Sequence, residues 1–130
     1  MFTLKQLKDA HSKVKTGADF PLYIKEIKAL GLISYEFMVS DGLIIYHGEQ
    51  DFKISSAPIY EMLSINPESS SELIKRSISI HQQGKTDLIT FCNEAVEAGV
   101  EKWVIDTEHM VCTYYDAKGV TLVAEPIPSA

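Results

Sequence analysis

The sequence lacks any long hydrophobic run. No apolar stretch among its 130 residues approaches the roughly 20 residues that a membrane-spanning helix needs. The first five residues, MFTLK, also lack the basic segment followed by an apolar one that a secretory signal peptide carries. The apolar fraction of 45% and the charged fraction of 23% are those of an ordinary globular protein. We therefore expect a cytoplasmic protein without a membrane segment.

Arginine is almost missing, with Arg76 as its one occurrence. Arginine is the side chain best suited to bidentate contacts with phosphates and bases. The 12 basic residues are also outnumbered by 18 acidic ones, which gives a formal net charge of −6. Six lysines in residues 1–30 could contact an acidic partner, but a solvated helix face is the favoured explanation. The composition therefore disfavours nucleic-acid binding.

Motifs that hold cofactors or metals are also missing. The sequence contains no Gly-rich phosphate loop, nucleophile elbow or dinucleotide fingerprint, and its cysteines and histidines lack the spacing of zinc ligands. Asp106, Glu108 and His109 fall together at one predicted hairpin tip and could loosely hold a cation, although a polar turn explains them as well. We assign no metal, no cofactor and no catalytic residue from the sequence.

An internal repeat is present. Gly31 and Gly99 each end a helical stretch and open a strand-rich one, and they lie 68 residues apart (99 − 31 = 68). The same shift pairs aromatic or apolar residues along most of the chain: Phe20 with Leu88, Tyr23 with Phe91, Tyr35 with Trp103, and Tyr46 with Tyr114. A fixed period of this kind indicates that each copy is one structural unit. We predict a tandem duplication.

The predicted repeats cover about 3–56 and 67–124, with a linker at 57–66, within one domain of residues 1–130. Each repeat is predicted to hold two helices and then three strands. Helices are expected to begin after Thr3, Asp19 and Asn66 (with Pro67 in the first turn) and to end at Gly17, Gly31, Gly84 and Gly99, and the linker could contain one helical turn from Pro58. Strands are expected at 32–39, 43–48, 52–55, 100–106, 110–116 and 119–124. The expected fold class is α+β: an antiparallel sheet with helices packed on it and a pseudo-twofold relation between the repeats.

The two cysteines can be tested against the repeat. Cys92 corresponds to Ile24 and Cys112 corresponds to Ile44, which are both apolar positions in the other copy. Free cysteine commonly behaves as a small buried hydrophobe, so we predict that both thiols lie in the core. Two such thiols without a disulfide pattern also favour a reducing cytoplasm.

Five side chains are candidates for ligand binding, and each has a structural alternative: His11, Tyr46, His47, His109 and Tyr114. His11, like His81, interrupts an apolar helical stripe, so it is either a hydrogen-bonded core histidine or part of a groove between the repeats. His47 ends a strand beside Tyr46 and near carboxylates, where it could act in acid–base chemistry or simply be solvated. The two tyrosines belong to an aromatic set that could floor a pocket or fill the core. His109 lies at the hairpin tip described above.

The N-terminal segment carries a family resemblance. The residues Phe2-Thr3-Leu4, Ala10-His11-Ser12-Lys13-Val14, Gly17-Ala18-Asp19-Phe20-Pro21 and Ala29-Leu30-Gly31 resemble the YdfO-like family of small uncharacterised bacterial and prophage-borne proteins, some of which are labelled phage envelope proteins. The resemblance implies a compact α+β domain and a bacterial or prophage origin. The family has no established catalytic residues, so none is transferred.

Two functional hypotheses remain. The first is a non-enzymatic binding or accessory protein, a monomer or homodimer, that acts on a protein partner or small molecule through its surface or through a groove between the repeats. The second is a small-molecule-binding protein or an enzyme that uses an aromatic and histidine-lined groove. The sequence identifies neither the partner nor the ligand.

Overall fold

The computed structural model describes residues 2–15 and 19–127. Within these residues the chain forms four helices and six strands, which confirms the α+β fold class. In chain order they are α1 (Leu4–His11), α2 (Phe20–Ala29), β1 (Leu32–Met38), β2 (Ile44–Gly48), β3 (Lys53–Ser55), α3 (Ser71–Gln82), α4 (Leu88–Glu97), β4 (Val100–Asp106), β5 (Val111–Asp116) and β6 (Thr121–Pro126). The order of two helices followed by three strands therefore occurs twice.

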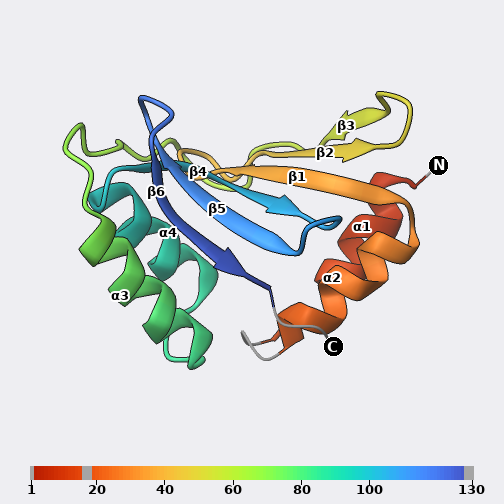
Figure 1. Ribbon diagram of the computed structural model, residues 1–130, viewed down its shortest axis with the longest axis horizontal. Helices are drawn as coiled ribbons and strands as arrows, with labels where there is room; N and C mark the ends of the chain where they lie inside the picture. The colour runs from red at the N-terminus through yellow and green to blue at the C-terminus, as the bar shows by residue number, and fades with distance from the viewer. Residues whose placement is uncertain (1, 16–18, 128–130) are drawn as a thin grey trace.

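The six strands form one antiparallel sheet in the order β3-β2-β1-β4-β5-β6. The central pair, β1 and β4, joins the two halves of the chain. All four helices lie on the same side of the sheet, with α1 and α2 under one half and α3 and α4 under the other (Figure 1). The two helical hairpins are splayed apart beneath the central strands.

The strand register repeats with the spacing found in the sequence. Tyr35 pairs with Tyr46 on β1 and β2, and Trp103 pairs with Tyr114 on β4 and β5. Both pairs of strands carry an irregularity at the same place, between Leu32 and Ser34 and between Val100 and Lys102. The strand pairing of the two halves is thus equivalent, while their origin by duplication stays a prediction.

The helix starts follow the predicted caps only in part. Thr3 forms the predicted capping box with Gln6, whose backbone N–H donates to the Thr3 hydroxyl at 3.2 Å. The second helix begins directly after Asp19, as predicted, but the Asp19 side chain makes no capping hydrogen bond to α2; its carboxylate accepts from the backbone N–H of Lys15.

The prediction for the third helix start is wrong. Ser70 caps α3 by accepting from the Leu73 backbone N–H. Asn66 instead lies in the segment between β3 and α3, which we call the connector, and attaches it to the end of α4. The Asn66 side chain donates to the Glu97 carbonyl at 2.9 Å and accepts from the Glu68 N–H. Pro67 lies in a bend, and no helical turn forms after Pro58.

The helix ends depend on glycines in the left-handed backbone region. Gly31 (φ 103°) and Gly99 (φ 83°) follow α2 and α4, as predicted. The predicted stop at Gly17 lies outside the described residues. The first helix already ends at His11, so Val14 does not belong to it but packs against the core from beyond its end.

The core fills the space between the helices and the sheet. Its fully buried members include Leu7, Ile24, Ile74 and Ile105. Cys92 and Cys112 are free and buried, which confirms their predicted place in the core. None of the helices within residues 2–15 and 19–127 has the length and apolar character that crossing a membrane requires.

Candidate ligand-binding groove

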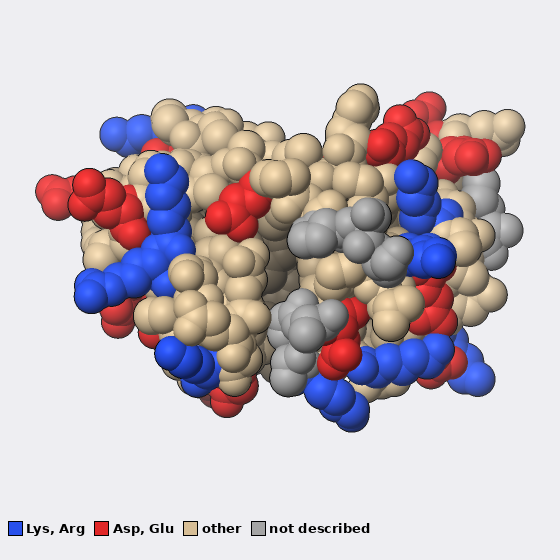
Figure 2. Space-filling view, turned by 60° about the horizontal axis from the view of Figure 1, so that its bottom comes forward, with Lys and Arg blue, Asp and Glu red and all other residues tan. Residues whose placement is uncertain are grey.

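A groove of about 830 Å³ lies between the two helical hairpins, over the central strands. With the helices turned toward the viewer, the molecule shows a recess between its two halves (Figure 2). The side chains that line it come from all four helices and from every strand except β3: His11, Val14, Lys15, Phe20, Pro21, Tyr23, Tyr35, Phe37, Ile44, Ile78, His81, Gln82, Gly84, Thr86, Asp87, Leu88, Phe91, Trp103, Ile105, Cys112, Tyr114, Glu125, Pro126 and Ile127. We call this hollow the central groove.

Equivalent aromatic clusters flank the central groove, one from each half of the chain. On one side the clustered rings are Tyr23, Tyr35 and Tyr46, and on the other they are Phe91, Trp103 and Tyr114. The centroids of Tyr35 and Tyr46 lie 5.7 Å apart at 49°, and those of Trp103 and Tyr114 have the same separation and angle. The cluster geometry is therefore nearly symmetric, although the chemistry of the rings is not.

The deeper groups of the central groove stay uncharged near neutral pH. Burial raises the pKa of the Tyr23 and Tyr35 hydroxyls well above their ordinary value, although a hydrogen bond between them partly offsets this for Tyr23. Burial also raises the pKa of the Cys112 thiol to about 12. A nucleophilic cysteine needs a lowered pKa, so Cys112 contributes apolar surface rather than a reactive thiolate.

Two histidines lie at the rim of the central groove, one on each side. The ring of His11 packs against that of Tyr23, with their centroids 5.2 Å apart. His81 stacks on Phe91 at 4.6 Å, and its Nδ1 lies 3.0 Å from the hydroxyl oxygen of Thr86. Desolvation lowers the pKa of both imidazoles. Both rings are therefore predominantly neutral near pH 7.

The structure separates the five candidates that the sequence suggested. His11 and Tyr114 line the central groove, whereas Tyr46 is buried behind its lining, where desolvation raises the pKa of its hydroxyl to about 12. His47 lies elsewhere, with its Nε2 2.9 Å from Glu36 Oε2. His109 lies at the β4–β5 hairpin tip. The five side chains thus do not form one site.

The environment of His47 is a surface ion-pair network. Glu36 Oε1 accepts from Lys102 Nζ at 2.8 Å, while its other oxygen contacts His47. Burial raises the pKa of Glu36, but the hydrogen bonds from Lys102 and His47 outweigh it and lower that pKa overall. Both oxygens of Glu36 are already occupied, so the network has the form of a structural ion pair rather than of a general base awaiting a substrate.

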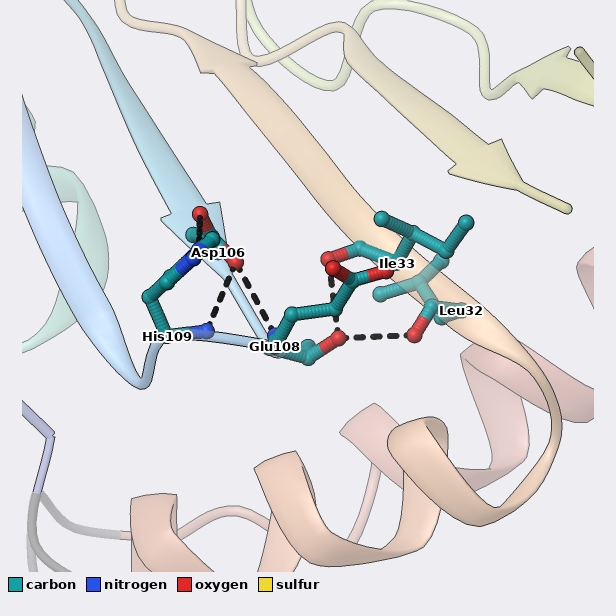
Figure 3. Close-up of polar contacts among 6 residues, drawn as sticks. Leu32, Ile33, Asp106, Glu108 and His109 are labelled. Atoms are coloured by element: carbon teal, nitrogen blue, oxygen red, sulfur yellow. Dashed lines mark hydrogen bonds and ion pairs between the residues drawn. The ribbon is translucent and has the colours of Figure 1, made fainter.

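The hairpin tip at His109 is likewise closed on itself. Asp106 accepts from the backbone N–H groups of Glu108 and His109 and from His109 Nδ1 at 2.8 Å (Figure 3). The Thr107 hydroxyl anchors the tip by donating to the carbonyls of Leu32 and Ile33. No cluster of three or more metal-ligating side chains occurs in the part of the chain that the structure describes. The polar-turn interpretation of this tip accounts for its contacts.

The sequence interpretation missed two carboxylates, Asp87 and Glu125, which both line the central groove. Asp87 caps α4 by accepting from the Thr90 N–H at 2.9 Å. Glu125 lies on β6 opposite Cys112 and accepts from Gln82 Nε2 at 3.2 Å. In the first half of the chain Ile44 corresponds to Cys112, and the residue opposite Ile44 is the buried Ser56. This difference between the halves becomes visible only once β5 and β6 are paired, so the sequence alone offered no signal for Glu125.

Comparison with known proteins assigns the chain to a family. Residues 8–126 match the model of a family described as Protein of unknown function (DUF1398). Since the match covers most of the chain, the protein belongs to this family. A search of curated proteins finds no match.

Proposed function

We propose that this member of the DUF1398 family is a non-enzymatic binding protein and that its central groove holds a small molecule with a flat apolar portion. The observation that supports this most strongly is the groove itself. Its volume of about 830 Å³ falls within the ~300–1,000 Å³ typical of small-molecule sites. Its lining is mainly apolar and aromatic, with a few polar groups at the rim, which is the composition that such sites commonly have.

The chemistry of the lining favours binding over catalysis. The thiol and hydroxyl groups of Cys112, Tyr35 and Tyr114 have raised pKa values because they are buried, which is the opposite of an activated nucleophile. The Nδ1 of His81 contacts Thr86, and a threonine hydroxyl within a chain is a poor nucleophile without stronger activation. An enzyme that uses this groove remains the alternative, and turnover lost on His81→Ala substitution would favour it.

The narrower sequence predictions are part of this proposal. They are a place in the YdfO-like group, a bacterial or prophage origin and a cytoplasmic location. An accessory role with a protein partner is compatible with a ligand-binding groove, because a ligand that orders both helical hairpins would also change the surface that they present.

The sole tryptophan of the chain makes the test direct. Trp103 lines the central groove, so its fluorescence reports on occupancy of the groove. We expect the neutral probe N-phenyl-1-naphthylamine to quench Trp103 by energy transfer, to brighten as it leaves water, and to raise the unfolding temperature, because a ligand stabilises the state it binds.

A pair of neighbouring substitutions separates the groove from nonspecific adsorption. Leu88 lines the central groove, whereas Ile89 on the same helix is 42% exposed and is not part of its lining. We expect Leu88→Lys to weaken probe binding about tenfold or more, since it places a charge in an apolar site, and Ile89→Lys to leave it nearly unchanged. Thermal melts establish that both variants fold. Absence of probe binding, or equal effects of the two substitutions, would overturn the proposal.

A further inference from the structure

We infer that the ligand of the central groove is a lipophilic organic cation, whose positive group lies on the side formed by α3, α4, β5 and β6. This inference rests on the proposed function, because it names the chemical class of molecule that the groove takes. It is supported by the distribution of charge around the groove, by the aromatic faces next to that charge and by the state of the rim histidines.

The ionisable groups of the groove are divided between its two sides. Asp87 and Glu125 line the α3–α4 side, and among the described residues of the lining Lys15, which follows α1, is the one lysine or arginine. Glu125 Oε2 accepts from Gln82, whereas its Oε1 has no hydrogen-bond partner among the residues that the structure describes. A carboxylate oxygen at the edge of an apolar site, without a cation beside it, favours a positively charged ligand.

The repeat shows that this polarity is specific to one side. Ahead of Asp87 the second copy carries one inserted residue, so the spacing before that point is 67 rather than 68 (84 − 17 = 67). Gln82 therefore corresponds to Lys15 in the first half (82 − 15 = 67), and the α3–α4 side has a neutral side chain where the other side has a cation. Ser56 stands where the second half has Glu125, as described above. Asp19 corresponds to Asp87 (87 − 19 = 68) but does not belong to the lining. Two halves of similar backbone therefore build sides of opposite charge.

The rings next to these carboxylates are suited to a cation. Phe91, Trp103 and Tyr114 lie with their centroids 5.5 to 6.5 Å apart. Organic cations are attracted to aromatic faces, most strongly to that of tryptophan. Tyr114 lies close enough to Glu125 for the carboxylate to contribute to the raised pKa of its hydroxyl, after the larger effects of burial and Cys112. Aromatic surface and negative charge therefore meet on this side of the groove.

The remaining charges do not oppose a cation. His11 and His81 are predominantly neutral near pH 7 because desolvation lowers the pKa of both. The net charge of −6 also attracts cations toward the molecule as a whole. An organic anion would have one lysine to pair with and would face two carboxylates across the groove. An organic anion is therefore the less favoured ligand, and the experiment below distinguishes it from a cation.

Tetraphenylphosphonium and tetraphenylborate provide a matched pair of probes, because they have nearly the same size and shape and opposite charge. We expect tetraphenylphosphonium to bind at least tenfold more tightly, measured by Trp103 quenching and by calorimetry. Glu125→Gln can keep the contact with Gln82 but removes the charge. We expect the factor by which it lowers the affinity for tetraphenylphosphonium to be about ten times the factor by which it lowers the affinity for N-phenyl-1-naphthylamine. Lys15→Gln should change the cation affinity in the opposite direction.

Glu97→Gln is the charge-matched control, because Glu97 is exposed on α4 and lies outside the groove lining. It should leave the cation affinity within twofold of the wild-type value. If the neutral probe binds but the two ions bind equally, or the anion binds better, or Glu125→Gln acts no more strongly than Glu97→Gln, the inference is wrong while the proposed function stands. If the neutral probe fails to bind as well, both are wrong.

Discussion

Glu36 and Val104 face each other across the central strands β1 and β4, at positions that correspond in the two halves of the chain (104 − 36 = 68). A twofold axis between them would exchange the two halves of the sheet. The side chains of the two residues differ, because the Glu36 carboxylate contacts Lys102 and His47 whereas the apolar side chain of Val104 can form no such contacts. The same pattern of matching backbone and differing side chains gives the central groove its unequal sides.

Glu36→Gln is expected to lower the free energy of unfolding by about 1 kcal/mol near neutral pH, since the ion pairs are partly exposed and glutamine can keep part of the hydrogen bonding. The pKa of Glu36 is lowered from 4.5 in the folded state. Its charge therefore contributes stability above that pH, and the contribution is lost as the pH falls through the lowered pKa. Urea denaturation of both proteins should show a difference near pH 7 that shrinks progressively as the pH falls below 4.5. A difference that did not change with pH would contradict the prediction.

Gly31 and Gly99 have the same local role but different surroundings. A Cβ added at Gly31 would meet no atom within 4 Å, whereas one added at Gly99 would lie 2.6 Å from the Ser69 Cα. Gly31→Ala should cost about 1–2 kcal/mol from the left-handed backbone alone. Gly99→Ala should cost about 1–3 kcal/mol more, because the connector must move. Urea midpoints test this, and equal losses would show that the connector yields without cost.

Thr107 is fully buried and is the counterpart of Val39 (107 − 39 = 68). Its hydroxyl donates to the carbonyls of Leu32 and Ile33 at 2.7 and 2.8 Å, which ties the β4–β5 tip to the start of β1. We expect Thr107→Val to lower the free energy of unfolding by about 1–2 kcal/mol, because it removes these bonds while keeping the volume. Thr113→Val on β5 is the matched control, since Thr113 is only half-buried. A loss no larger than that of the control would exclude an anchoring role for the hydroxyl.

Much of the fold follows from local sequence signals. Gly31 and Gly99 predict helix ends because glycine readily adopts the positive φ that both have in the structure. The alternation of apolar residues after each glycine predicts strands that bury one face. The start of α3 could not be predicted in this way. Asn66 followed by Pro67 has the composition of a helix start, but the Asn66 side chain has a tertiary partner, the Glu97 carbonyl, that is 31 residues away. Local propensity cannot anticipate a competing partner at that distance.

The candidate site was predictable in outline only. The apolar stripes that His11 and His81 interrupt allowed two interpretations, a groove or a hydrogen-bonded core histidine; both residues line the central groove, and His81 also has a hydrogen-bond partner in Thr86. Glu125 was not predictable, because its position depends on the pairing of β5 with β6. That pairing shifts register between Tyr114 and Tyr115, and a shift of one residue turns a side chain to the other face of a sheet. The periodicity of the sequence does not reveal such a shift.

The state of His81 predicts how stability depends on pH. Desolvation lowers its pKa from 6.5, against smaller opposing effects of Thr86, Asp87 and Glu94, which all lie near the ring. The unfolded chain therefore binds a proton more readily than the folded protein does, so stability falls as the pH drops below about 6.5. We expect the unfolding temperature of the wild-type protein to decrease between pH 7 and pH 5, and His81→Phe to reduce this decrease while keeping the stacking on Phe91.

His109 provides the control of opposite sign. Its hydrogen bond to Asp106, together with the charge of that carboxylate, raises the pKa of the imidazole above 6.5. The contribution of His109 to stability is therefore present at acid pH and is lost as the pH rises through the raised pKa. His109→Gln should consequently steepen the acid decrease that His81→Phe reduces. If both substitutions changed the pH dependence in the same direction, or His81→Phe left it unaltered, the burial of a neutral His81 at the rim of the groove would not be the cause of the acid sensitivity.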